Sequence, residues 1–175
     1  MGRNQIDEKL IDYTVFLNAN TYLGVSGVQL PSLEMMSDTL KGAGIAGEID
    51  SITPGHFGPM PITLNWRTSP TKEAIELMKP KAHLIDFRGA IQVFDKTTSE
   101  YKTVGKKITV KAMPKKLDLG KAEAATTMDG STEMECIYLK IVEDGKKLIE
   151  IDKLNNIYVV DGFDYRAELR SILGL

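Results

Sequence analysis

The sequence is poor in the residues that most often carry chemistry. It has a single cysteine, Cys136, and two histidines, His56 and His83. One cysteine excludes an internal disulfide, which argues against a secreted, disulfide-stapled design. Together the three residues show no ligand spacing typical of zinc, so we expect no metal and no cofactor. The G-x-S-x-G, Walker A and H-E-x-x-H patterns are missing too, and the chain is predicted not to be an enzyme.

Long hydrophobic runs are also missing. No apolar run is long enough to span a bilayer, and the first residues lack the apolar core of a signal peptide. The 175 residues are 42% hydrophobic and 26% charged, which is ordinary for one soluble domain. We therefore expect a single domain over residues 1–175 that folds in a cytoplasm and does not insert stably into a membrane.

A glycine-rich stretch has the spacing of a dinucleotide-binding loop, since Gly42, Gly44 and Gly47 match G-x-G-x-x-G. In that motif the glycines follow a buried strand and open a helix. Here the residues before them are half polar, and those after them alternate and stop at a Pro-Gly pair. No acidic residue stands about twenty positions later to hold a ribose. We predict a flexible glycine- and proline-rich loop over residues 42–59, and a dinucleotide-binding enzyme stays as an unfavoured alternative.

Charge is unevenly distributed around a net value of −2. Residues 101–121 carry seven lysines and one acid, whereas residues 122–164 carry ten acids and four lysines. Two solvated strand faces explain this most simply. A nucleic-acid-binding β-barrel module is an alternative, although the basic stretch has one aromatic residue and no arginine. Opposite charges could also meet between identical subunits. The residues expected at such a subunit or ring interface are Gly42, Gly44, Gly47, Lys107, Lys111, Glu133 and Glu135.

Most of the chain has the alternation of half-buried strands. Ile62, Leu64 and Trp66 alternate with polar residues, and Asp144-Gly145 between two β-rich runs predicts a tight hairpin. Gly89 interrupts a strand and suggests a bulge or a close approach of backbone. The expected strands are 13–17, 22–25, 62–67, 83–93, 107–112, 136–142, 148–152 and 157–160.

Helix signals occur twice. One short helix is predicted after an N-cap at Ser69 and before Pro80, and a C-terminal helix is predicted between a cap at Asp164 and Gly174. The expected fold is mainly β, an antiparallel barrel or sandwich with one internal helix packed on it and a short C-terminal helix. His83 and Cys136 fall on apolar strand positions and are predicted to be buried and inert, and His56 receives no role.

An ordered set of segments, which spans nearly the whole chain, resembles the major tail tube proteins of contractile-tailed phages and of phage-tail-like bacteriocins (tailocins). The opening is similar at residues 15–18, 20–24 and 30–33, with the glycine-rich stretch after it, and the middle is similar at residues 116–121. The ending is similar at residues 149–152, 161–164 and 170–175. The family more often has Asn-Gly where this chain has Asp161-Gly162, and Asp tolerates the same turn.

This resemblance implies a hexameric ring in which the sheets of neighbouring subunits join into a continuous inner β-barrel. Rings would stack into a rigid tube inside a contractile sheath, as part of a virion tail or a tailocin particle assembled in the host cytoplasm. The implied partners are further copies of this chain, the sheath protein, a baseplate or tube initiator, a tape measure protein and a tail terminator. DNA would pass through the lumen without specific binding in a phage, and a tailocin tube would permeabilise the target membrane.

Overall fold

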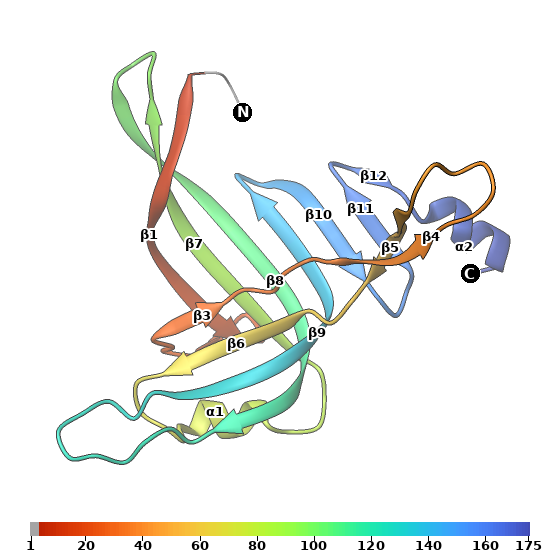
Figure 1. Ribbon diagram of the computed structural model, residues 1–175. Helices are drawn as coiled ribbons and strands as arrows, with labels where there is room; N and C mark the ends of the chain where they lie inside the picture. Colours follow the sequence, from red (N-terminus) through yellow and green to blue (C-terminus); the bar gives the residue numbers. More distant parts are fainter. Residues whose placement is uncertain (1–3) are drawn as a thin grey trace.

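A broad antiparallel sheet forms the body of the molecule, and the computed structural model describes residues 4–175 (Figure 1). In chain order, its strands are β1 (Gln5–Leu17), β2 (Thr21–Tyr22), β3 (Gly27–Gln29), β6 (Pro61–Trp66), β7 (His83–Asp95), β8 (Glu100–Asp118), β9 (Gly130–Glu143), β10 (Lys146–Asp152), β11 (Ile157–Val160) and β12 (Phe163–Asp164). They lie in the order β12-β11-β10-β9-β8-β7-β1-β2, and β6 pairs with both β9 and β3. The predicted mainly β, antiparallel fold class is confirmed.

The hydrophobic core lies in the lower half of this sheet in Figure 1, where β3 and β6 cross strands β7 to β9. Ile62, Leu64 and Trp66 are each at most 1% exposed, as their alternation predicts. The Trp66 indole donates a hydrogen bond to the buried Thr132 hydroxyl at 3.0 Å. Other members of the core are Val15, Leu17, Met60, Ile85, Phe87, Val110, Ala112, Met134 and Leu139.

Two residues predicted to be inert are confirmed as core residues. Cys136 is fully buried, and this burial raises the pKa of its thiol to about 12. His83 is 1% exposed, with Nε2 at 3.2 Å from the carbonyl oxygen of Lys79. Neither side chain has the exposure that a nucleophile or a general base needs.

The predicted Asp-Gly hairpin is also confirmed, because Asp144 and Gly145 join β9 to β10 with φ values of 46° and 77°.

The bulge or close backbone approach suggested at Gly89 is not found there. The register shifts lie on β1, between Asp7 and Lys9 and between Leu10 and Asp12, rather than at Gly89 itself. A Cβ at Gly89 would come within 2.9 Å of the Leu10 and Phe87 side chains, so this glycine makes room for side chains and not for backbone.

The internal helix, α1 (Lys72–Leu77), is shorter than predicted and starts later. Its N-cap is Thr71, whose hydroxyl accepts the backbone N–H of Ala74 at 3.0 Å. The predicted cap, Ser69, is instead buried against Gly130, where an added Cβ would lie 2.4 Å from the Ser69 Cβ. Because a threonine stood two residues further on, the capping rule alone could not choose between the two positions.

The C-terminal helix, α2 (Ala167–Leu173), ends as predicted at Gly174, which has a φ of 72°. The prediction that Asp164 caps its start is wrong, because the N-cap position is Arg166 and makes no side-chain capping bond. Asp164 instead accepts the backbone N–H of Arg166 and pairs with Arg170 at 2.6 Å. Neither helix among residues 4–175 is long and apolar enough to cross a membrane.

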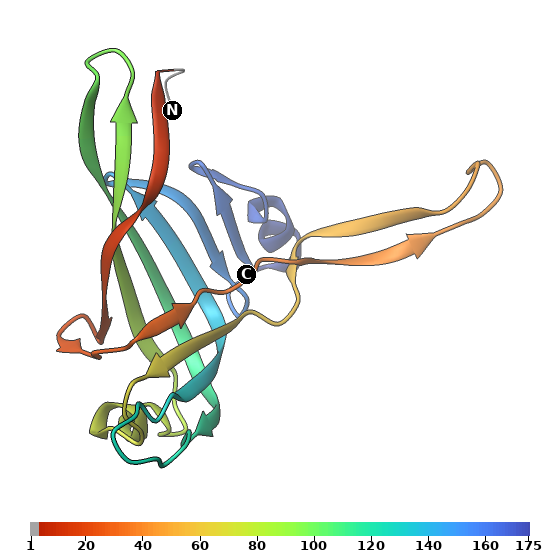
Figure 2. The same cartoon turned by 60° about the vertical axis from the view of Figure 1, so that its left-hand side comes forward.

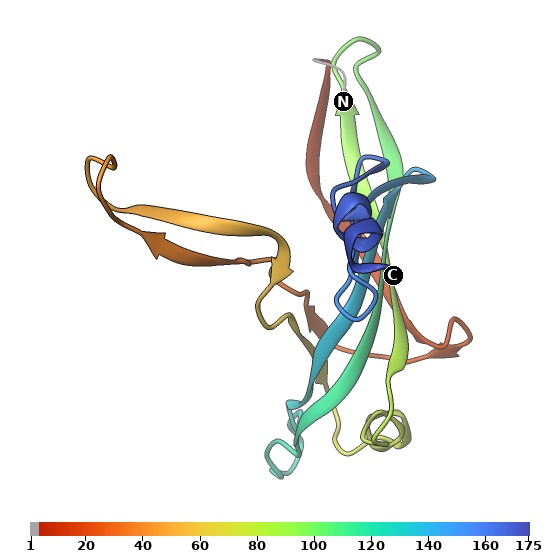
Figure 3. The ribbon, with the colours of Figure 1, turned by 90° about the vertical axis from the view of Figure 1, so that its right-hand side faces the viewer.

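The predicted loop over residues 42–59 is also wrong in its extent. Residues 49–57 form strand β5 (Ile49–Phe57), which pairs with β4 (Met35–Leu40) in a separate two-stranded sheet. Only residues 41–48 connect the two strands. Figures 2 and 3 show this hairpin projecting from the body of the subunit. We call residues 35–57 the arm.

The turn between β7 and β8 gives a pH prediction through Asp95. Its carboxylate accepts hydrogen bonds from the Lys102 ammonium at 2.6 Å and from the Thr97 N–H at 2.9 Å. These contacts, Lys102 first, lower the pKa of Asp95 from 3.8 to about 2. The ionised carboxylate therefore stabilises the folded state fully above about pH 4, and this contribution is lost as the pH falls toward about 2.

Asp95→Asn should remove this part of the acid sensitivity. We expect the melting temperature of the variant to fall less steeply between about pH 4 and about pH 2 than that of the unmodified protein. Calorimetry across that range measures both slopes. Parallel curves would show that Asp95 does not contribute.

Candidate assembly surfaces

The arm has little of the packing that would hold it in water on its own. Two-stranded hairpins are marginally stable without further packing. No residue between Met36 and Thr53 is buried. Large apolar side chains are nevertheless exposed along it, and these are Met36, Leu40, Ile45, Ile49 and Ile52. An exposed, apolar, projecting hairpin is typical of a segment that packs against another molecule.

The three glycines predicted at an interface lie at the tip of the arm. Gly42, Gly44 and Gly47 each have open space around the position of a Cβ, with no heavy atom within 4 Å. Gly44 and Gly47 have φ values of 90° and 126°, which favour glycine for backbone reasons. The glycines therefore form a tight, exposed turn. Strand β5 follows them instead of the helix that a dinucleotide-binding loop needs to hold a phosphate.

The two lysines predicted at an interface have partners within their own subunit. Lys107 pairs with Asp86 at 3.2 Å, and the Lys111 ammonium lies 5.4 Å from the centre of the Tyr138 ring. Asp86 is only 1% exposed and also accepts the Thr109 hydroxyl hydrogen bond at 2.6 Å. Sequence reasoning missed Asp86, because only the pairing of β7 with the lysine-rich strand β8 brings it beside these lysines.

The two predicted glutamates are engaged in the same way. Glu133 pairs with Lys115 at 2.6 Å, and this hydrogen bond is the main reason why the pKa of Glu133 is lowered. Glu135 accepts the Met60 N–H at 2.9 Å and the Lys153 ammonium at 3.1 Å. The structure places the four charged residues on the neighbouring strands β8 and β9 but does not gather them into one site.

Antiparallel pairing accounts for the uneven charge of the sequence. The lysine-rich strand β8 lies beside the acid-rich strand β9, and Lys106 pairs with Glu143 at 2.8 Å across them. Opposite charges thus meet inside one subunit. This weakens the nucleic-acid alternative, because phosphate binding needs cations that are not already paired with acids.

Both edges of the large sheet are open. At one edge β2 covers only Phe16 and Leu17 of β1, and residues 5–12 of β1 are exposed on both faces. At the other edge β12 is two residues long. An open edge exposes unpaired backbone N–H and C=O groups, which natural proteins cover or pair.

A second apolar surface covers the C-terminal end of the chain, beside β11 and β12 (Figure 1). No residue of α2 is buried in the subunit. We call its most exposed members the C-terminal surface, and these are Phe163, Tyr165, Ile172, Leu173 and Leu175. Within residues 4–175 no three metal-ligating side chains gather into a candidate metal site.

Comparisons with known proteins identify the family of this chain. The model of the phage tail tube protein FII family matches residues 7–174. The tail tube protein of Escherichia phage P2 is 29% identical over 177 residues, covering 95% of this chain and 97% of that protein.

Among solved structures, a chain of the PVC sheath/tube terminator, from an extracellular contractile injection system in its extended state, aligns with a TM-score of 0.56. The match covers 78% of this chain and 97% of that chain at 12% identity, so it shows a shared fold. Because the family model spans nearly all of the sequence, this chain belongs to the phage tail tube protein FII family.

Proposed function

We propose that this tail tube protein assembles into hexameric rings that stack into the rigid inner tube of a contractile tail. The match of the family model over residues 7–174 carries this proposal. The exposed arm and the two open sheet edges support it, because each requires a partner that the isolated subunit does not provide.

Ring closure is proposed to join the two open edges of the large sheet. Pairing the exposed part of β1 with the β10–β12 side of the next subunit would extend the sheet around a ring and remove both edges. Such a contact is heterologous, since two different surfaces meet, and it closes when the rotation between subunits divides a full turn. A sixfold ring is the closure that the resemblance implies.

Ring stacking is proposed to use the arm, with Gly42, Gly44 and Gly47 at the joint. In the free subunit the arm tip makes only short-range contacts, such as the Ile45 N–H to the Gly42 carbonyl at 3.1 Å and Lys41 to Glu48 at 3.7 Å. Contact with another subunit would order it further. Lys107, Lys111, Glu133 and Glu135 would contribute to an interface only by exchanging the partners they already have.

Hydrogen exchange at residues 41–48 tests this role of the arm tip. We expect the backbone amides there to exchange rapidly in the free subunit and at least about tenfold more slowly in assembled tubes, since contact suppresses local opening. Amides of the core strand β6 serve as the control and should be protected in both states. Equal exchange of residues 41–48 in both states would rule out the tip as a joint.

The proposed partners, location and transport role all depend on the tube. The proposed partners are the sheath, the baseplate or tube initiator, the tape measure protein and the tail terminator, and the proposed location is a virion tail or tailocin particle assembled in the bacterial cytoplasm. DNA would pass through a phage tube without specific binding, and a tailocin tube would open the target membrane. The chain itself is proposed to be purely structural and not catalytic.

Negative-stain electron microscopy of the purified protein tests the assembly. We expect rings, short stacks or tubes with a central channel. A protein that stays monomeric at high concentration and binds single-stranded DNA would favour the nucleic-acid-binding module instead. A thermal shift with a nicotinamide cofactor would revive the dinucleotide-binding alternative, and we expect none.

A further inference from the structure

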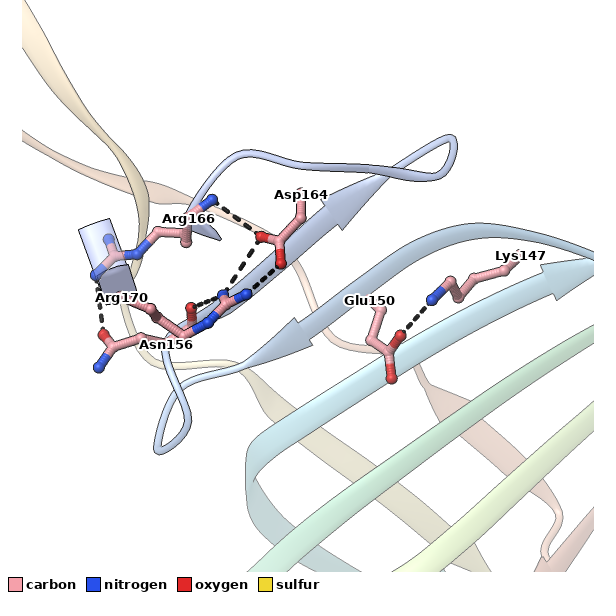
Figure 4. Close-up of polar contacts among 6 residues, drawn as sticks. All are labelled: Lys147, Glu150, Asn156, Asp164, Arg166 and Arg170. Atoms are coloured by element: carbon pink, nitrogen blue, oxygen red, sulfur yellow. Dashed lines mark hydrogen bonds and ion pairs between the residues drawn. The ribbon is translucent and has the colours of Figure 1, made fainter. Parts of the chain in front are cut away.

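One buried arginine connects the base of the arm to the end of the chain. Arg166, just before α2, is 5% exposed. Its guanidinium donates to the carbonyl oxygen of Pro54 in β5 at 3.2 Å and to the side-chain oxygen of Asn156 at 2.9 Å. Figure 4 shows the Asn156 contact beside the neighbouring pair of Asp164 and Arg170. Residues far apart in the sequence are thus held by one side chain.

The arm is shaped to admit this side chain. At Gly55 an added Cβ would lie 2.5 Å from Cδ and 3.0 Å from Cγ of Arg166, so the arginine stem occupies the place of a side chain. Gly55 also has a φ of 76°. Glycine meets both demands, the close approach and the backbone conformation.

Two further contacts join the same regions around the arginine. The Phe57 ring at the base of the arm meets the Tyr158 ring edge-on, with centroids 5.3 Å apart. The Lys153 ammonium donates to the Gly58 carbonyl oxygen at 2.7 Å. The base of the arm is therefore fixed from several directions, whereas no residue of its outer part, from Met36 to Thr53, is buried.

The chemistry of Arg166 makes this junction specific. Its guanidinium makes no ion pair in the described part of the chain, and its Nε has no hydrogen-bond partner. A buried cation is costly unless oxygens surround it. The Pro54 carbonyl is one of the oxygens that it contacts, so swinging the arm away would leave the charge with one hydrogen-bonding partner fewer.

We propose that Arg166 is a positioning residue that fixes the direction of the arm relative to the large sheet before assembly. The consequence for tubes rests on the proposed function, because an arm already held in its bound direction loses less conformational freedom when it docks. The fixed direction itself is a property of the isolated subunit and is tested there.

The test compares two arginines of the same segment. Arg170 bonds to Asp164 and to the Asn156 carbonyl, both within the C-terminal segment, and does not reach the arm. Arg170→Ala is therefore the matched control for Arg166→Ala. Spin labels on cysteines introduced at Asp50, in the paired strands of the arm, and at Thr98 report the distance between the arm and the β7–β8 turn. The Cys136 thiol stays unlabelled because it is fully buried in the core.

Electron spin resonance then measures the distance distribution in dilute, monomeric protein. We expect one narrow distribution in the parent protein and in Arg170→Ala, and a distribution about twofold wider in Arg166→Ala, because a released hinge samples more angles. Arg166→Met, which keeps the stem against Gly55 but loses the hydrogen bonds, should lie between them. A broad distribution in the parent, or an unchanged width in Arg166→Ala, would overturn the proposal.

Melting temperature alone would not distinguish a positioning role of Arg166 from a merely stabilising one, since both alanine variants lose contacts and should melt lower. The distance width separates them. The distance measurement is also independent of the proposed function, because it is made on the isolated subunit. If the distribution is narrow but the protein forms no tubes, the proposed tube function is refuted and the positioning role of Arg166 stands. If the distribution is broad in a protein that does form tubes, the positioning role is refuted and the tube function stands.

Discussion

Shortening the arm should leave a folded subunit that forms no tubes. Replacing residues 36–53 with a short Gly-Ser turn removes only residues that are not buried, and the arm strands pair with each other instead of with the large sheet. We therefore expect the melting temperature to change by less than about 4 °C, which corresponds to about 1–2 kcal/mol in a chain of this size. Electron microscopy should show the complete loss of stacked rings.

A finer variant separates the apolar contact from the length of the arm. Replacing exposed apolar residues with serine, at Met36, Leu40 and Ile49, keeps the hairpin length and should also prevent stacking. Thr39→Ser is the matched control, because Thr39 lies exposed on the same hairpin and its replacement removes none of the large apolar side chains. Tubes of normal length from the shortened protein would contradict the proposed role of the arm.

Trp66→Ala should have the largest effect on folding. Trp66 is 1% exposed at the end of β6, where it packs in the hydrophobic core of the large sheet. Removing a buried indole leaves a cavity and costs about 3–5 kcal/mol. It also leaves the Thr132 hydroxyl, now 3.0 Å from the indole nitrogen, without its donor.

Denaturant unfolding followed by far-ultraviolet circular dichroism measures this loss. Trp66→Phe keeps most of the apolar volume but loses the hydrogen bond and part of the buried ring system, so we expect a smaller cost of about 1–3 kcal/mol. A loss below about 1 kcal/mol for Trp66→Ala would mean that the contacts of Trp66 are not the centre of the core.

Local patterns in the sequence were enough for most of the sheet. Alternation located β6 and the core part of β8, because each has one buried face. The two β-rich runs on either side of Asp144-Gly145 located β9 and β10. The strand over residues 157–160 was predicted with its observed limits. Capping rules were less reliable. The Ser69 hydroxyl is buried with no hydrogen-bond partner among the described residues, and Asp164 pairs with Arg170.

The arm and the charges were harder to predict for physical reasons. β5 contains Pro54 and Gly55 and has no buried face, so it lacks the pattern of a half-buried strand. The lysine-rich and acid-rich stretches were read as separate surfaces because their pairing depends on β8 and β9 being neighbours. Arg166 could not be recognised either, since its partners Pro54 and Gly55 lie about a hundred residues away in the sequence.

Cryo-electron microscopy of the assembled protein tests the central claim most directly. We predict rings of six subunits in which the β1 edge of each subunit pairs with the β10–β12 side of its neighbour, and in which each arm contacts the adjacent ring. Particles in which the sheets of neighbouring subunits stay separate, or in which the arms project freely into solvent, would contradict it.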